Sequence, residues 1–243
     1  MRKNPKVAMI AALEREVRPL VRGWQVTERE HQGRRFKVFE NERAVLVCGG
    51  IGPDAARRAA EAVITSYDPV TVLSVGFAGA LDPGLKAGAV FAPRTVVDIG
   101  DGSRIETGAG NGVLASFAAI ADAEQKAKLA KAYGAQAVDM EAAAVGRAAQ
   151  AHGVPFAALK AISDESDFVM PPLKAFVGEA GQFHPAKLAV FAAFRPWLWL
   201  SLIRLARNSS RAAKALCAAL NRYNRPGEMS ATPELQSAVG RER

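Results

Sequence analysis

Residues 138–144 of this 243-residue chain read VDMEAAA, and residues 161–164 read AISD. Each motif places a carboxylate, Glu141 or Asp164, at the end of an apolar run, where a strand gives way to a helix or a loop. In α/β proteins, ligands bind in the crevice outside the carboxyl ends of the strands. Two acids at two such ends can act on two parts of one substrate, so the pair of motifs predicts a catalytic site.

Each acid also has a purely structural interpretation. Glu141 in the first turn of a helix would interact favourably with the helix macrodipole, a contribution of about 0.3–1 kcal/mol. Ser163 and Asp164 would then form a cap or a turn. For any single residue this interpretation is the better one. The joint pattern, together with Glu16 just after the first apolar run, favours the catalytic interpretation.

Helical patterns alternate with short runs of Val, Ile, Leu and Ala along the chain. Strands are predicted at residues 7–12, 36–40, 44–48, 71–75, 88–97, 113–117 and 155–162, the second and third as a hairpin-like pair. Helices are predicted at residues 14–22, 55–66, 124–133 and 141–152, with a loop at residues 98–112. This alternation predicts one α/β domain with a full core.

The composition narrows the class of protein. Cys48 and Cys217 are the only cysteines and lie far apart, so neither a disulfide framework nor a cysteine-based zinc site is predicted. The apolar run at residues 7–13 is too short for a signal peptide. Arg195-Pro196 interrupts the longest apolar region, so no membrane span is expected. These features favour a cytoplasmic, enzyme-like domain.

The net charge of +8 is concentrated at one end of the chain. Residues 195–243 contain nine Lys and Arg but only three Glu, and therefore account for +6 of this total. Any anionic partner is expected to bind to this segment rather than to the body of the domain.

Four short motifs occur in order along the chain: residues 12–17 (ALEREV), 74–81 (SVGFAGAL), 138–142 (VDMEA) and 160–164 (KAISD). Together they resemble the motifs of the purine nucleoside phosphorylase and methylthioadenosine/adenosylhomocysteine nucleosidase superfamily. The resemblance extends from residue 7 to about residue 167, and residues 207–220 are similar to the last helix of that family. It implies a single domain with a central mixed β-sheet flanked by helices, of the nucleoside phosphorylase-like type.

The resemblance implies that the acids act on a purine N-glycosidic bond, whose cleavage builds positive charge on the ribose and negative charge on the base. Asp164 corresponds to the acid that protonates purine N7, a contribution expected to be about 10²–10⁴-fold. Glu141 corresponds to the carboxylate that binds the ribose hydroxyls, Met140 packs against the sugar, and Glu16 activates the attacking water. The same resemblance places six further residues at the substrate: Ile51, Phe77, Ala119, Ile120, Lys160 and Ser163.

Three features favour water over phosphate as the nucleophile. Ser74 stands where the phosphorylases have a phosphate-binding arginine, and residues 11–14 (AALE) replace a Gly-Asp-Pro-like phosphate loop. The carboxylate of Glu16 would also repel an anion. A hydrolytic purine nucleosidase is therefore predicted, with phosphorolysis as an alternative, and no metal or organic cofactor is implied.

The chain departs from the small-substrate nucleosidases on the 5′ side of the nucleoside. The stretch between Asp98 and the second acid motif is shorter than in those enzymes, and none of the three histidines matches their 5′-side histidine. Phe77 replaces a small hydroxyl residue and Lys160 replaces an arginine. The pocket is therefore expected to be open on this side, next to an apolar flap at residues 168–173 (FVMPPL).

The Met-Pro-Pro flap (residues 170–172), the Arg-Pro-Trp segment (residues 195–197) and the short middle loop together resemble the hopanoid-associated branch of the superfamily. Those enzymes remove adenine from adenosylhopane and leave ribosylhopane. A 5′-methylthioadenosine/S-adenosylhomocysteine nucleosidase is the alternative with a small substrate.

The C-terminal part is predicted to continue the domain. Residues 1–187 form the catalytic part, residues 188–224 an amphipathic helical segment, and residues 225–243 a disordered tail. At helical spacing, one polar stripe contains Arg204, Asn208, Arg211 and Lys214. Tryptophans beside a basic stripe are typical of an interfacial helix, so residues 194–220 are expected to contact an anionic membrane surface. For residues 207–220, packing on the core with a solvated basic face is the default interpretation, so attachment is favoured for residues 194–205.

The expected partners follow from these features. They are a lipid-linked nucleoside and the inner face of the cytoplasmic membrane. A second copy of the chain, forming a homodimer, is also expected, because the superfamily commonly assembles as dimers or hexamers. Nucleic acid is not expected, because the basic stripe is paired with Trp and Leu rather than with stacking aromatic residues around a groove. A non-catalytic lipid- or nucleic-acid-binding protein that uses the basic tail is the remaining alternative.

Overall fold

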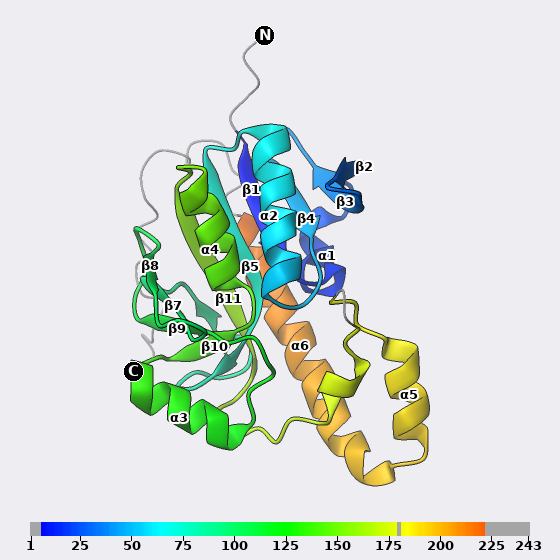
Figure 1. The fold of residues 1–243 in the computed structure, drawn as a ribbon. Helices are drawn as coiled ribbons and strands as arrows, with labels where there is room; N and C mark the ends of the chain where they lie inside the picture. Colours follow the sequence, from blue (N-terminus) through cyan, green and yellow to red (C-terminus); the bar gives the residue numbers. More distant parts are fainter. Residues whose placement is uncertain (1–5, 179–180, 222–243) are drawn as a thin grey trace, which may run out of the picture.

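The computed structural model describes residues 6–178 and 181–221, which fold around a mixed eleven-stranded sheet with helices on both faces (Figure 1). The strand order is β2-β3-β4-β1-β5-β10-β9-β7-β8, and β11 joins this path by pairing with β5 and β6. The predicted fold class, a single α/β domain with a central mixed sheet flanked by helices, is confirmed.

The elements alternate along the chain as the sequence pattern predicts. The strands are β1 (Val7–Ala11), β2 (Gln25–His31), β3 (Arg34–Glu40), β4 (Ala44–Cys48), β5 (Thr71–Ala80), β6 (Val90–Phe91), β7 (Thr95–Asp98), β8 (Arg104–Glu106), β9 (Val113–Ser116), β10 (Ala137–Asp139) and β11 (Phe156–Asp164). The helices are α1 (Glu14–Val21), α2 (Pro53–Tyr67), α3 (Ala123–Tyr133), α4 (Ala142–Ala151), α5 (Pro185–Ala193) and α6 (Trp199–Leu220), with 3₁₀ turns η1 (Leu173–Phe176) and η2 (Pro196–Leu198).

Strand β5 brings the two acid motifs together. It pairs in parallel with β1 on one side and with β11 on the other, and its last residues pair antiparallel with β10. Gly79 of β5 lies opposite both Val138 of the first motif and Asp164 of the second. Two segments far apart in the sequence thus end at one residue of the sheet.

Helices cover the sheet in two layers (Figure 1). Buried residues of α2 and α4 form one apolar cluster with the sheet, and buried residues of α1 and α6 form another on the opposite face. A third, smaller cluster lies beneath α3. Because α6 packs on α1 and on β11, its second half shares the core of the preceding residues.

The structure corrects two predicted elements near the middle of the chain. The strand predicted at residues 88–97 is two strands, β6 and β7, separated at Pro93, which has no N–H for a ladder hydrogen bond. The loop predicted at residues 98–112 contains β8, which pairs antiparallel with β7. A three-residue strand such as β8 is too short to give an alternating pattern.

The sequence pattern also does not predict strand β2, for a different reason. Its sequence, QVTEREH, is polar, and most of its residues are exposed. Antiparallel pairing with β3 along its whole length supplies the hydrogen bonds that form it. The apolar pattern therefore gives no indication of this strand.

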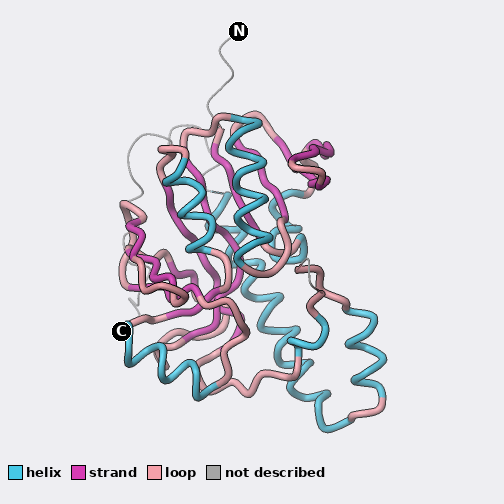
Figure 2. Tube along the Cα trace, in the orientation of Figure 1, coloured by secondary structure: helices cyan, strands magenta, loops and turns pink. Residues whose placement is uncertain are grey.

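The last helix is longer than the predicted residues 207–220, because α6 begins at Trp199. Its second half is buried on the sheet, whereas its first half extends past the sheet together with α5 (Figure 2). Leu216 is fully buried in the second half, and Leu200 is 82% exposed in the first. Asn208, predicted to lie in the polar stripe, is buried and interrupts it. The predicted tail at residues 225–243 lies outside the described residues.

Because the two halves of α6 differ in burial, substituting a leucine in each half should change the free energy of unfolding by different amounts. We expect Leu216→Ala to lower the free energy of unfolding by about 2–5 kcal/mol, because it leaves a cavity in the core. Leu200→Ala, the matched control, should change it by less than about 0.5 kcal/mol. Urea denaturation of the two variants measures the difference. Equal losses would contradict the placement of the two halves.

Candidate active site

Three carboxylates from three separate strand ends line one cleft of about 1210 Å³. Asp164 ends β11, Glu141 is the N-cap residue of α4 just after β10, and Glu16 lies in the first turn of α1 just after β1. The cleft lies where the sequence predicts it, at the ends of strands. Nine of the ten predicted site residues, all except Lys160, are among its lining: Glu16, Ile51, Phe77, Ala119, Ile120, Met140, Glu141, Ser163 and Asp164.

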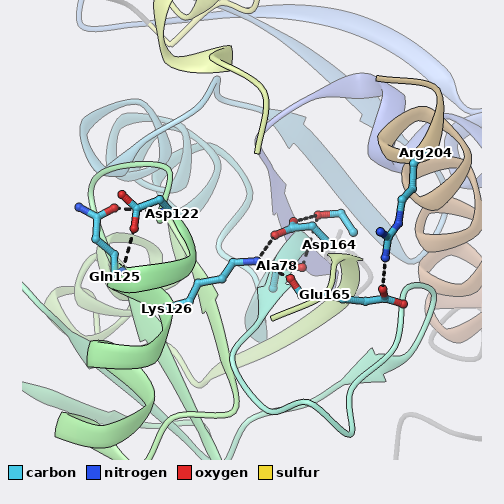
Figure 3. Close-up of polar contacts among 8 residues, drawn as sticks. Ala78, Asp122, Gln125, Lys126, Asp164, Glu165 and Arg204 are labelled. Atoms are coloured by element: carbon cyan, nitrogen blue, oxygen red, sulfur yellow. Dashed lines mark hydrogen bonds and ion pairs between the residues drawn. The ribbon is translucent and has the colours of Figure 1, made fainter. Parts of the chain in front are cut away.

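Asp164 is 5% exposed and both of its carboxylate oxygens accept hydrogen bonds (Figure 3). Oδ1 accepts from the Ser163 hydroxyl at 2.7 Å, and Oδ2 is 2.5 Å from Lys126 Nζ. Gly79 of β5 lies directly against the pair: a Cβ there would be 2.8 Å from Asp164 Oδ2 and 3.2 Å from Lys126 Cε. A residue without a side chain is therefore needed at this position.

Lys126 is a site residue that the sequence reasoning missed. It extends from α3, which begins with a capping box of Asp122 and Gln125, and donates both to Asp164 and to the Glu165 carbonyl at 2.7 Å (Figure 3). Its side chain is buried and lines the cleft. A lysine in a helix with several exposed lysines gives no sequence signal of burial, since only the fold brings β11 to it.

Glu141 is fixed by backbone donors. Its Oε1 accepts from the Gly52 N–H at 2.8 Å, and its Oε2 accepts from the Met140 N–H at 3.3 Å. Burial, followed by the neighbouring Asp139 carboxylate, raises the pKa of Glu141 to about 7. Lys160 opposes this rise.

Glu16 is also buried, and burial raises its pKa to about 7 against the opposing charge of Lys160. It accepts a weak bond from the Leu13 N–H at 3.4 Å. Gly76, which has a φ of 147°, leaves room for it: a Cβ there would be 2.8 Å from Glu16 Oε2. A carboxylate with a pKa near neutrality is suited to take a proton from water.

Lys160 lies beneath the acids rather than in the cleft. It is 1% exposed, pairs with Asp139 Oδ2 at 2.8 Å, and donates to Ser74 Oγ at 2.9 Å. Asp139 also accepts from the Ala142 N–H at the start of α4. The structure thus places Lys160, predicted to contact substrate, in a buried ion pair that stabilises the charges of the site.

The cleft continues beyond the acids. Residues of the predicted flap and of η1 line it at Met170 and Leu173, and α6 lines it from Leu202 to Lys214. Apolar side chains of two sheet strands, Val26 and Phe39, complete this outer part. Basic side chains line the cleft as well, among them Arg18, Arg22 and Lys214, so the site joins the buried acids to an outer part of mixed apolar and basic character.

The sequence matches the profile of the phosphorylase superfamily over residues 6–124 and 111–182, which together span more than half of the chain. The chain belongs to this superfamily. The predicted family is confirmed at that level.

Relatives and solved structures agree with the assignment. A 5′-methylthioadenosine/S-adenosylhomocysteine nucleosidase of Actinobacillus succinogenes is 27% identical over 201 residues, covering 67% of this chain and 86% of the relative. A nucleosidase of the same name from Colwellia psychrerythraea, solved with adenine, has a TM-score of 0.67 at 20% identity, covering 91% of this chain and 95% of that chain. Futalosine hydrolase of Helicobacter pylori has a TM-score of 0.63 at 22% identity, covering 90% and 98%. The chain is an enzyme of this superfamily. The relatives to which its sequence is similar are nucleosidases.

The raised pKa of Glu16 predicts a pH dependence of stability. Below its ordinary pKa of 4.5, this carboxyl is protonated in both the folded and the unfolded chain. As the pH rises from 4.5 through about 7, the unfolded chain loses a proton that the folded chain retains, so folding becomes less favourable.

Replacing Glu16 with Gln removes this loss. Between pH 5 and pH 8, the unfolding free energy of the natural chain should fall by about 2–3 kcal/mol more than that of Glu16→Gln. Denaturant titrations across this range measure both curves. If the curves run parallel, Glu16 is ionised in the folded chain throughout the range.

Proposed function

We propose that this protein is a purine N-glycosidase that releases adenine from a nucleoside with a bulky apolar group on C5′, with adenosylhopane as its substrate and ribosylhopane as its product. The observation that supports this proposal is the shape of the cleft. Three buried acids line the same cleft as apolar side chains of α6, among them Leu202 and Leu205.

The buried end fits the chemistry of N-glycoside cleavage. Asp164 is positioned for the departing purine, and Glu141, held by two backbone N–H groups, for the ribose on which positive charge develops. Met140 packs against the sugar, and Glu16 takes a proton from the attacking water. Preorganised carboxylates of this kind need no reorganisation as the charge appears.

The site favours water over phosphate. Ser74, at the position of a phosphorylase arginine, is fully buried, and its hydroxyl accepts from Lys160. Lys160 in turn pairs with Asp139 and does not reach the cleft. A phosphate ion near Glu16 and Glu141 would meet carboxylates.

The outer part of the cleft favours a large 5′ group over a methylthio group. Its volume of about 1210 Å³ exceeds the roughly 300–1,000 Å³ typical of pockets for drug-sized ligands. The lining residues in this part include Val26, Phe39, Leu202 and Leu205. A 5′-methylthioadenosine/S-adenosylhomocysteine nucleosidase, the function named for the relatives, is the second candidate.

We also propose that the protein attaches peripherally to a membrane through an exposed apolar face. This face comprises Phe194, Trp197, Trp199, Leu200 and Ile203, all between 49% and 82% exposed. Exposed basic residues flank it, among them Lys187, Arg204 and Arg207. Tryptophans next to basic residues fit an anionic lipid surface. Within the described ranges, no helix is both long and apolar enough to cross a bilayer.

Adenine release from paired substrates tests the reaction. With adenosylhopane, release should be faster than with 5′-methylthioadenosine, should not require phosphate, and should fall about 10²–10⁴-fold in Asp164→Asn. Asp167→Asn, at an exposed acid in the loop that follows β11, is the matched control and should remain near the natural rate.

Three outcomes would overturn parts of this proposal. Equal or better turnover of 5′-methylthioadenosine would exclude the lipid-linked substrate. A requirement for phosphate with a ribosyl-1-phosphate product would exclude hydrolysis. Full activity of Asp164→Asn and of Glu141→Gln would exclude the assigned roles.

Vesicle flotation tests the membrane proposal. The protein should float with phosphatidylglycerol vesicles, and the double variant Trp197→Ser, Leu200→Ser should bind at least about tenfold more weakly, because two exposed apolar side chains are lost. Val70→Ser removes an exposed apolar side chain elsewhere and serves as the control. If the double variant floats unchanged but no longer forms a dimer in solution, the face is instead an interface between two copies.

A further inference from the structure

The buried pair of Lys126 and Asp164 raises a question about the proton that the purine receives. The two side chains are 3% and 7% exposed, and their charged atoms are 2.5 Å apart. Oδ2 of Asp164 accepts from this ammonium, and Oδ1 accepts from the Ser163 hydroxyl. Both oxygens thus act as acceptors, as in an ionised carboxylate. The donors around Asp164 are therefore candidates for the source of the proton that N7 receives.

Lys126 is the group next to Asp164 that has protons to give. An ammonium has three N–H donors, of which one points to Asp164 and another to the Glu165 carbonyl. Lys126 also lines the same cleft as Asp164. It is held in place by the first turn of α3, where its N–H donates to the Asp122 carbonyl at 2.8 Å. Figure 3 shows the side chain extending from α3 to the acid.

We propose that Lys126 supplies the proton that reaches purine N7, with Asp164 as the group through which it passes. Lys126 is therefore a positioning and proton-supplying residue that acts through Asp164. The proposal rests on the proposed purine N-glycosidase function.

Protons and charge are conserved in the proposed cleavage. The C1′–N9 bond breaks, and its electron pair moves into the purine ring, which makes N7 basic. Lys126 Nζ first gives a proton to Asp164 Oδ2, which turns the ion pair into a neutral amine and a carboxylic acid. The acid then gives this proton to N7, so that Asp164 is again a carboxylate, Lys126 is a neutral amine, and adenine leaves neutral. Water adds to C1′ and its proton passes to Glu16 and then to solvent. After adenine has left, Lys126 regains a proton from solvent.

A nucleoside whose base leaves without protonation distinguishes a proton-supplying role of Lys126 from a purely structural one. A 7-methylpurine nucleoside has a fixed positive charge on the imidazole ring, so its base leaves neutral without protonation. The variant Lys126→Met keeps the length of the side chain but has no proton to supply. The matched control is Lys128→Met, on the same helix, whose side chain is 72% exposed.

We expect Lys126→Met to lower kcat for adenine release by about 10²–10³-fold with little change in KM, and to lower kcat for the 7-methylated nucleoside less than about fivefold. Asp164→Asn should show the same selectivity. Lys126→Arg should stay slow with the adenine nucleoside, because guanidinium retains the charge but does not release its proton. Urea denaturation confirms that each variant is folded.

Equal losses with both nucleosides, or recovery in Lys126→Arg, would overturn the proposal and leave Lys126 a structural partner of Asp164. A natural rate in Lys126→Met would overturn it as well. Failure of the proposed function is distinguishable, because the natural protein would then release no base from either nucleoside.

Discussion

The ammonium of Lys160, 1% exposed, lies beneath Asp139, Glu16 and Glu141, and its ion pair with Asp139 is 2.8 Å long. Three carboxylates gathered this close in a buried region would repel one another, and each would bear the cost of burial. Lys160 lowers the pKa of both Glu16 and Glu141 against that cost. Removing one partner of such a buried pair typically destabilises a protein by about 3–5 kcal/mol. The active site and the fold thus depend on the same cation.

Strand β5 supplies the geometry for this arrangement. Lys160 pairs in register with Gly76 of β5, the glycine that leaves room for Glu16, and Asp164 pairs with Gly79. The two glycines let buried carboxylates lie directly against the strand where any side chain would collide with them. The Lys126–Asp164 pair occupies the space next to Gly79. The glycines of residues 74–81 are therefore part of the site, although neither bears a functional group.

Local sequence patterns predict those parts of the fold and of the site that depend on neighbouring residues in the chain. The acids Glu16, Glu141 and Asp164 follow apolar runs, so the rule that sites lie at strand ends places them in one cleft, as observed. Strand β2 and the burial of Lys126 have no local pattern, because both arise from pairing and packing with distant segments. Lys160 illustrates a third case. Its motif indicates the right region, but only the three-dimensional structure shows that it lies beneath the cleft and not in it.

Helix α6 is divided between two environments, with Leu216 in the core and Leu200 in solvent. We therefore expect substitutions of its exposed first-half residues to affect folding little, although this half lines the cleft at Leu202 and Leu205. Random variation would accumulate there more readily than in the acid motifs, where each change affects buried charges. Under the proposed function, substitutions in the first half of α6 would change which 5′ group fits the cleft and would leave the three carboxylates unchanged.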